Sequence, residues 1–142
     1  MNLIRVVVLV VLALSACDNS GPTARSDPQT AASLQQMKSA IAAATGYSSD
    51  SLEILVGAAH MRISISDSKL AEEDQAGRES AATAILSAAE QSMAADARFG
   101  SIQQVSVAII HPAAEGANAA SHTEDVVDFR RAPSQRFSKH IS

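Results

Sequence analysis

Several residue types are scarce in this chain of 142 residues, and each shortage excludes a class of function. The chain has one cysteine, no tryptophan and one tyrosine, and aromatic residues make up 3% of it. A single cysteine excludes an intrachain disulfide and any metal site built from several thiolates. So few aromatic rings provide no stacking platform for nucleic-acid bases or sugars. The net charge of −4 provides no basic surface for nucleic acid either.

Large apolar side chains are also few. The hydrophobic fraction is 46%, but alanine supplies much of it, and charged residues make up only 18%. The length fits one domain, and its core must be thin because alanine buries little area.

The N-terminal segment, MNLIRVVVLVVLALSAC, carries the strongest signal in the sequence. Arg5 makes the start positive, and residues 6–14 form an unbroken apolar run. As a helix this run reaches about 14 Å, less than half the hydrocarbon core of a bilayer. A positive start, a short apolar run and small residues before a cleavage point are typical of a secretory signal. The alternative is an ordinary signal peptide that is cut elsewhere.

The end of this segment, Leu14-Ser15-Ala16-Cys17, resembles the lipobox of bacterial lipoproteins. In that family, signal peptidase II cuts before a cysteine that already carries diacylglycerol. The resemblance implies that residues 1–16 are a signal peptide and that Cys17 is lipidated. Each buried CH₂ contributes about 0.8 kcal/mol, so two or three acyl chains hold a protein on the membrane essentially permanently.

The residue after the cysteine, Asp18, resembles the inner-membrane retention signal of Gram-negative lipoproteins. We therefore expect a lipid-anchored protein of the cell membrane that faces the periplasm. Asp18 favours the inner membrane, and the outer membrane is the alternative.

The mature chain divides into a tether and one domain. Residues 17–28, the lipidated cysteine and a polar stretch with Gly21 and Pro22, predict a flexible tether. Residues 29–142 predict a small domain, in which helical and alternating periods of apolar residues follow one another. The expected elements are a helix at 29–45 that ends before Gly46, strands near 52–56 and 61–65, a helix at 69–97, and strands at 105–110 and 126–130. The alternative to the first two strands is one long strand with a bulge at Gly57, and the alternative for the first turns of the second helix is a loop from which residues 72–74 cap it.

This α-β-β-α-β-β order predicts an α+β fold, a two-layer sandwich. Its helices would cover one face of a mostly antiparallel four-stranded sheet. The order resembles that of BON-type domains, small bacterial envelope modules associated with membrane attachment. Gly57 would stand for the glycine between their central strands, whereas Gly100-Ser101-Ile102 departs from the Gly-Val pair before their last strand. The resemblance implies a lipid-associated module.

Few residues suggest a catalytic or metal-binding site. His111, Glu115 and His122 flank a loop at 113–122, but their spacing fits no named metal site. His60 is expected on a polar strand face without an acid partner, and Ser66-Asp67-Ser68-Lys69 matches the S-x-x-K pattern without the other motifs of penicillin-recognising enzymes. Beyond Pro133, the residues Arg136, Lys139 and His140 predict a solvated basic tail, with Phe137 and Ile141 as candidates for packing against the domain.

The sequence thus predicts an envelope lipoprotein with no catalytic residue, cofactor or metal, most simply a non-catalytic binding or assembly module. Its partners would be the membrane, through the lipid, and another envelope protein, with no nucleic acid. The alternatives are a periplasmic ligand- or metal-binding protein or enzyme that uses the His111–His122 loop, and a BON-like lipid-associated module. The oligomeric state is left open.

Overall fold

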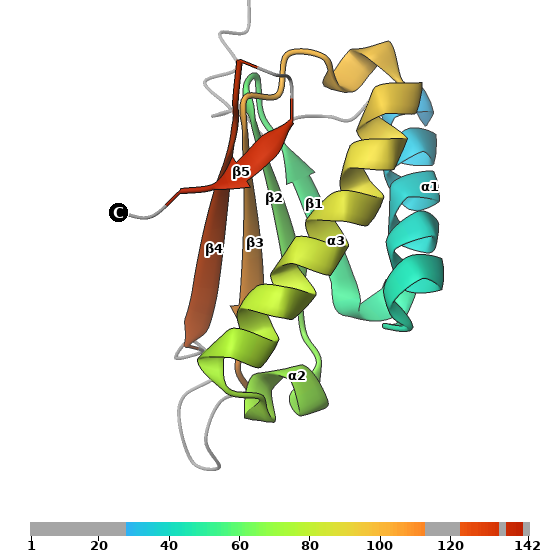
Figure 1. Ribbon diagram of the computed structural model, residues 1–142. Helices are drawn as coiled ribbons and strands as arrows, with labels where there is room; N and C mark the ends of the chain where they lie inside the picture. The colour runs from blue at the N-terminus through green and yellow to red at the C-terminus, as the bar shows by residue number, and fades with distance from the viewer. Residues whose placement is uncertain (1–27, 113–122, 134–135, 141–142) are drawn as a thin grey trace, which may run out of the picture.

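The computed structural model describes residues 28–112, 123–133 and 136–140 of the chain (Figure 1). The leader, the lipobox and the tether therefore lie outside the described residues, apart from Pro28. The elements are, in chain order, α1 (Pro28–Thr45), β1 (Leu52–Val56), β2 (His60–Ile65), α2 (Ser68–Glu72), α3 (Gln75–Ala95), β3 (Gln104–Ile110), β4 (Glu124–Arg131) and β5 (Phe137–Lys139). Short 3-10 turns precede β1 at Ser49–Ser51 and follow α3 at Ala97–Phe99.

The strands form one sheet in the order β1-β2-β3-β4-β5. Only β2 and β3 are parallel, because α3 provides the crossover between them, and the other pairs are antiparallel. The predicted α+β class and mostly antiparallel sheet are confirmed. The prediction of four strands is wrong by one, since β5 adds a fifth.

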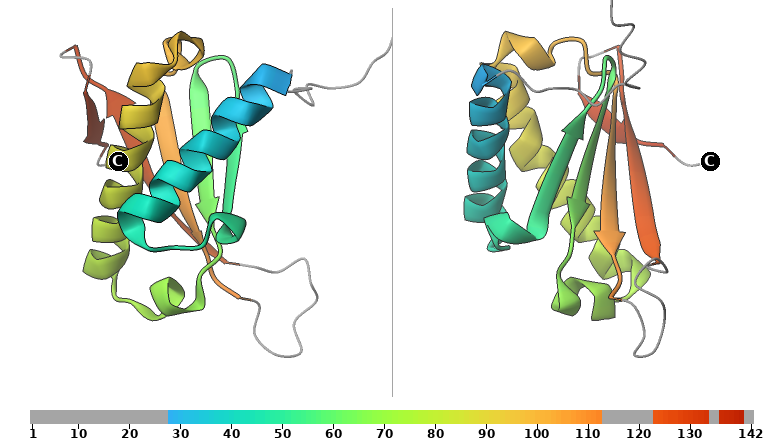
Figure 2. Two further views of the ribbon diagram at one scale, coloured as in Figure 1. Left: turned by 90° about the vertical axis from the view of Figure 1, so that its right-hand side faces the viewer. Right: turned by 180° about the vertical axis from the view of Figure 1, so that it is seen from behind.

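Both long helices cover the same face of the sheet (Figure 2). The alternating residues of β2 and β3 explain why, since Met61, Ile63 and Ile65 and the valines of β3 are buried against the helices. Two alanines on α3, Ala82 and Ala89, are fully buried, and their small side chains let that helix lie close to the sheet. The opposite face carries no helix, and we call it the open face.

The helix predicted at 69–97 is two helices. The Asp67 side chain caps α2 by accepting from the Leu70 N–H at 2.9 Å. The Asp74 side chain in turn caps α3 by accepting from the Gly77 N–H at 2.7 Å. An N-cap residue has extended backbone and cannot lie inside a helix, so Asp74 interrupts the pattern.

The predicted end of the first helix is confirmed. α1 stops at Thr45, and Gly46 follows with φ +80° while its N–H donates to the Ala42 carbonyl at 2.8 Å. A left-handed residue at this position is a common way to end a helix, and glycine takes it without steric cost.

The prediction of a solvated basic tail is wrong for residues 137–139, which form β5, whereas the packing considered for Phe137 is confirmed. The Phe137 N–H donates to Glu90 Oε1 at 2.9 Å, and Lys139 Nζ lies 2.5 Å from Glu79 Oε2. Both carboxylates belong to α3, so that helix holds the last strand against β4. The Arg131 guanidinium also lies over the Phe137 ring, 5.1 Å from its centre.

Candidate functional site

The open face of the sheet carries a row of hydrogen-bonded polar side chains. His60 Nε2 lies 2.8 Å from Ser106 Oγ, and this hydroxyl donates to Asp128 Oδ1 at 2.5 Å. The strand register explains the row, because His60 of β2 pairs with Gln104, two residues before Ser106 on the same face of β3, and Ser106 lies opposite Asp128 of β4. The sequence points to His60 but to neither Ser106 nor Asp128, because only the strand register brings the three together.

The order of these groups does not activate Ser106 as a nucleophile. A hydroxyl has one proton, and here Ser106 donates it to Asp128, so His60 Nε2 must be the donor toward Oγ. In a catalytic triad the histidine lies between the other two groups and accepts the serine proton. Ser106 is also only 4% exposed, which leaves a substrate little access to it. The row links three strands to one another.

Ion pairs involve several charged groups nearer the other end of β3 and β4. Arg62 of β2 pairs with Glu124 of β4, so their side chains cross the open face of β3. Asp125 Oδ2 accepts from Arg78 Nε at 2.7 Å and lies 2.9 Å from His111 Nε2.

Some of the other residues that the sequence suggested as site residues lie within the described residues, and some do not. Cys17, Asp18, Glu115 and His122 lie outside the described residues. In the S-x-x-K pattern, Asp67 is the N-cap of α2, and Ser66 and Lys69 are exposed. The described residues hold no group of three or more histidine, cysteine or acidic side chains placed to bind a metal ion.

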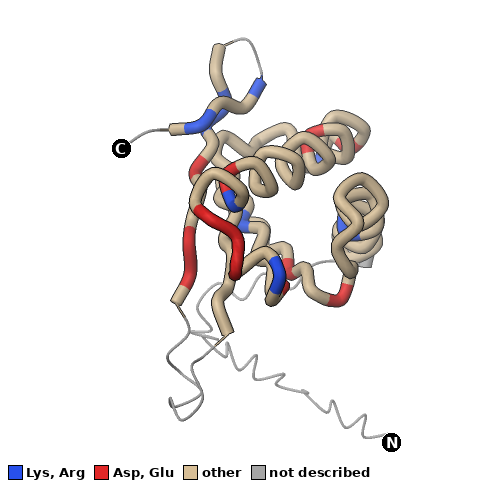
Figure 3. The backbone as a smooth tube through the Cα atoms, turned by 60° about the horizontal axis from the view of Figure 1, so that its bottom comes forward, with Lys and Arg blue, Asp and Glu red and all other residues tan. Residues whose placement is uncertain are grey.

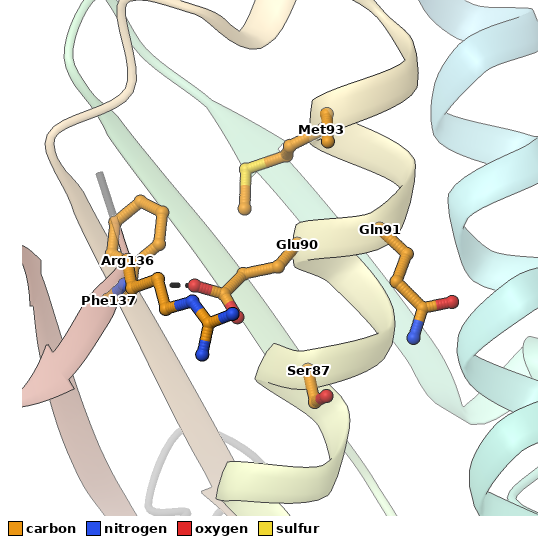
Figure 4. Close-up of a pocket in the computed structure, with 7 residues that line it drawn as sticks. Ser87, Glu90, Gln91, Met93, Arg136 and Phe137 are labelled. Atoms are coloured by element: carbon orange, nitrogen blue, oxygen red, sulfur yellow. Dashed lines mark hydrogen bonds between the residues drawn. The ribbon is translucent and has the colours of Figure 1, made fainter. Parts of the chain in front are cut away.

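A hollow of about 440 Å³ lies between α3 and β5 (Figure 4). Glu90 and Arg136 both extend into it from opposite walls, and Met93 and Phe137 provide an apolar side. Because Glu90 already accepts from the Phe137 N–H, its carboxylate fixes β5 in place. The hollow thus lies where α3 and β5 are joined by this hydrogen bond, and the Glu90 carboxylate has a structural role.

Two carboxyl groups have lowered pKa values, and both join separate elements. A hydrogen bond from Ser33 of α1, at 2.7 Å, is the main cause that lowers the pKa of Asp96, and the Arg98 N–H adds to it. A hydrogen bond from Lys139 is the main cause that lowers the pKa of Glu79, and Gln75 adds to it. Perturbed pKa values often mark active sites, but structural ion pairs produce them as well.

The phenol of Tyr47 has a raised pKa. Burial is the main cause, and the nearby carboxylates of Asp67 and Glu73 add to it. Tyr47 follows the end of α1 and packs at the edge of the core. Its raised pKa therefore results from packing and does not indicate a catalytic role.

Two large apolar side chains are exposed on the open face. Leu55 of β1 is 55% exposed, and Val126 of β4 is 42% exposed. A second hollow, of about 320 Å³, lies beside Leu55 and Ile110 and is otherwise lined by polar residues, among them the paired Arg62 and Glu124. Within the described ranges, no helix is both long enough and apolar enough to cross a membrane.

No protein-family model, curated protein or solved structure matches the chain. The resemblances to bacterial lipoproteins and to BON-type domains therefore stay predictions from the sequence.

Proposed function

We propose that this chain is a membrane-anchored envelope lipoprotein whose α+β domain is a non-catalytic binding or assembly module. The lipobox at Leu14-Ser15-Ala16-Cys17 supports the anchor, and Asp18 favours the inner membrane. The polar tether that follows would let the domain stand clear of the headgroups on the periplasmic side.

One observation supports binding over catalysis. Several polar side chains on the described part of the open face are bonded to one another, namely the His60–Ser106–Asp128 row and the Arg62–Glu124 pair. The exposed side chain of Leu55 remains available for contact with a partner.

The test is crosslinked co-purification from native membranes, in which a C-terminally tagged wild-type chain is compared with Cys17→Ser. We expect the lipidated form to retain an envelope component that the Cys17→Ser form loses, because the anchor concentrates the domain at the membrane. A tagless strain controls for nonspecific capture. Recovery of no component with either form, together with confirmed acylation, would contradict the binding role.

A second candidate is metal binding by the His111–His122 loop. The contact between His111 Nε2 and Asp125 favours it, because ligating histidines commonly bond a carboxylate through their second ring nitrogen. This proposal predicts stoichiometric zinc in protein purified without chelators, and its loss in His111→Ala and in His122→Ala. A wild-type protein without bound metal would refute it.

A further inference from the structure

β1 is an outer strand of the sheet that lacks the usual protection against pairing with another chain. Among the described strands it neighbours only β2. Natural outer strands are commonly protected by lysine, proline, a bulge or an inward-pointing charge. The strand reads Leu-Glu-Ile-Leu-Val, pairs with β2 in unbroken register, and has Glu53 on the open face as its one charge. It is therefore a competent template for a further strand.

Two hydrogen bonds show which backbone groups of β1 face β2. The Gly57 N–H donates to the His60 carbonyl at 2.7 Å, and the Ser66 N–H donates to the Ser51 carbonyl at 2.9 Å. In an antiparallel pair, successive residues alternate between groups that face the partner strand and groups that face away. Odd-numbered residues of β1 therefore bond to β2, and even-numbered residues direct their backbone outward.

Three even-numbered residues of β1 direct backbone groups outward, and at two of them, Ile54 and Val56, both groups are unpaired among the described residues. The Leu52 N–H bonds to the Ser49 carbonyl in the preceding 3-10 turn. The N–H and C=O groups of Ile54 and Val56 have no partner among the described residues. These groups lie next to the exposed side chain of Leu55.

We propose that two copies of this chain pair through β1, antiparallel, about a two-fold axis that passes between Leu55 and Leu55 of the second copy. The proposal rests on the binding role proposed above and names the partner of this edge. In this register the outward N–H groups of Ile54 and Val56 donate to the outward carbonyls of Val56 and Ile54 of the second copy. The two sheets become one.

Neighbouring registers fit less well. A pairing centred on Glu53 would place two carboxylates directly opposite each other, and like charges in that position are destabilising. A pairing centred on Ile54 would oppose Val56 to Leu52, whose N–H is already used. Only the pairing centred on Leu55 bonds the free N–H and C=O groups of Ile54 and Val56 to one another and covers the exposed leucine with an identical one.

The charge of the helix layer does not oppose this approach. A two-fold axis perpendicular to the sheet keeps both helix layers on one side, so α1 of each copy would lie near the joined edge. Lys38 is the single charged residue of α1 (Figure 3). The exposed side chains of this helix are uncharged, namely Gln29, Ala31, Ala32, Gln35, Gln36, Ser39, Ala43 and Ala44. No repulsion between like charges opposes the contact.

One strand edge is a short interface, below the roughly 1,200–2,000 Å² that stable complexes bury. We therefore expect the pairing to be weak in dilute solution and populated where the chains share a membrane, because confinement raises the effective concentration.

The test is site-directed crosslinking of the full-length lipidated chain in native membranes. In Leu55→Cys, the register places the two Cβ atoms about 4.5–5.5 Å apart, so mild oxidation should produce a disulfide-linked dimer. Glu53→Cys is the matched control on the same face of β1. Glu53 would lie opposite Gly57 of the second copy, and the two Glu53 positions would be about 13 Å apart. Val126→Cys controls for a comparably exposed site on β4.

We expect at least a fivefold higher yield of dimer from Leu55→Cys than from either control. Leu55→Glu should abolish the dimer detected with a longer amine-reactive crosslinker, and Val126→Glu should not. Equal yields from the three cysteine variants would overturn the proposal, as would a Leu55→Cys variant whose introduced thiol reacts with maleimide but forms no dimer. An adduct of that thiol with a different protein would refute self-pairing and leave the binding role intact.

Discussion

Replacing Ser106 by alanine tests whether the row across the open face stabilises the fold. The hydroxyl links His60 of β2 to Asp128 of β4 across β3. Alanine removes a single oxygen and leaves almost no cavity, so the loss is that of the hydrogen bonds.

The expected loss of stability depends on how far the bonded side chains are buried. A hydrogen bond to a charged group contributes about 1.5–3 kcal/mol to stability. Asp128 is half-buried and His60 is exposed, so water can replace part of the loss. We therefore expect Ser106→Ala to lower the free energy of unfolding by about 1–2 kcal/mol, toward the low end of that range. His60→Ala should cost less than about 0.5 kcal/mol because its ring is in water.

The assay is urea unfolding of the unlipidated Cys17→Ser chain at pH 7, followed by circular dichroism. The result that refutes the reasoning is a Ser106→Ala variant as stable as its parent, or a His60→Ala variant that loses as much stability as Ser106→Ala. Either outcome would mean that the row is not coupled through the serine.

Three further predictions concern the helix–sheet contact, the last strand and the end of α1. Ala89→Leu should destabilise the fold by about 1–3 kcal/mol in urea unfolding, because Ala89 is fully buried, whereas exposed Ala84→Leu should have little effect. The lowered pKa of Glu79 means that its bond to Lys139 contributes stability above the unfolded pKa, near 4.5, and that this contribution is lost as pH falls through the lower folded value. Glu79→Gln should therefore be less stable than wild type at pH 7 and equal to it at pH 2, and a gap that persists at pH 2 would contradict this. Gly46→Ala should cost about 1 kcal/mol because φ is +80°, and a thermal scan that shows no loss would contradict the left-handed assignment.

The elements that the sequence predicted well are those with strong periods. The alternation of Met61, Ile63 and Ile65 specified both β2 and the face that it buries, because one face of the sheet lies against helices and the other does not. Gly46 specified the end of α1 through its backbone conformation.

The missed features depend on contacts between distant residues. β5 has three residues, too few for a period, and it is held by Glu79 and Glu90, which lie far away in the sequence. The His60–Ser106–Asp128 row depends on the register of three strands, which periodicity alone does not give. The only local signal for this row was a serine, Ser106, within an otherwise apolar strand segment.

The interruption at residues 73–74 had a local signal. Acidic residues cluster there, and Asp74 is a strong N-cap type, but a cap and a first-turn acidic residue look alike in a sequence. The Asp74 bond to the Gly77 N–H distinguishes them.

The most direct test of the central claim, that this is a lipid-anchored module, is the mass of the N-terminal peptide of the mature protein isolated from membranes. The account predicts a chain that begins at Cys17, with diacylglycerol on its sulfur, and a precursor that accumulates when signal peptidase II is inhibited. A mature chain that begins elsewhere, or a Cys17 with a free thiol, would contradict it.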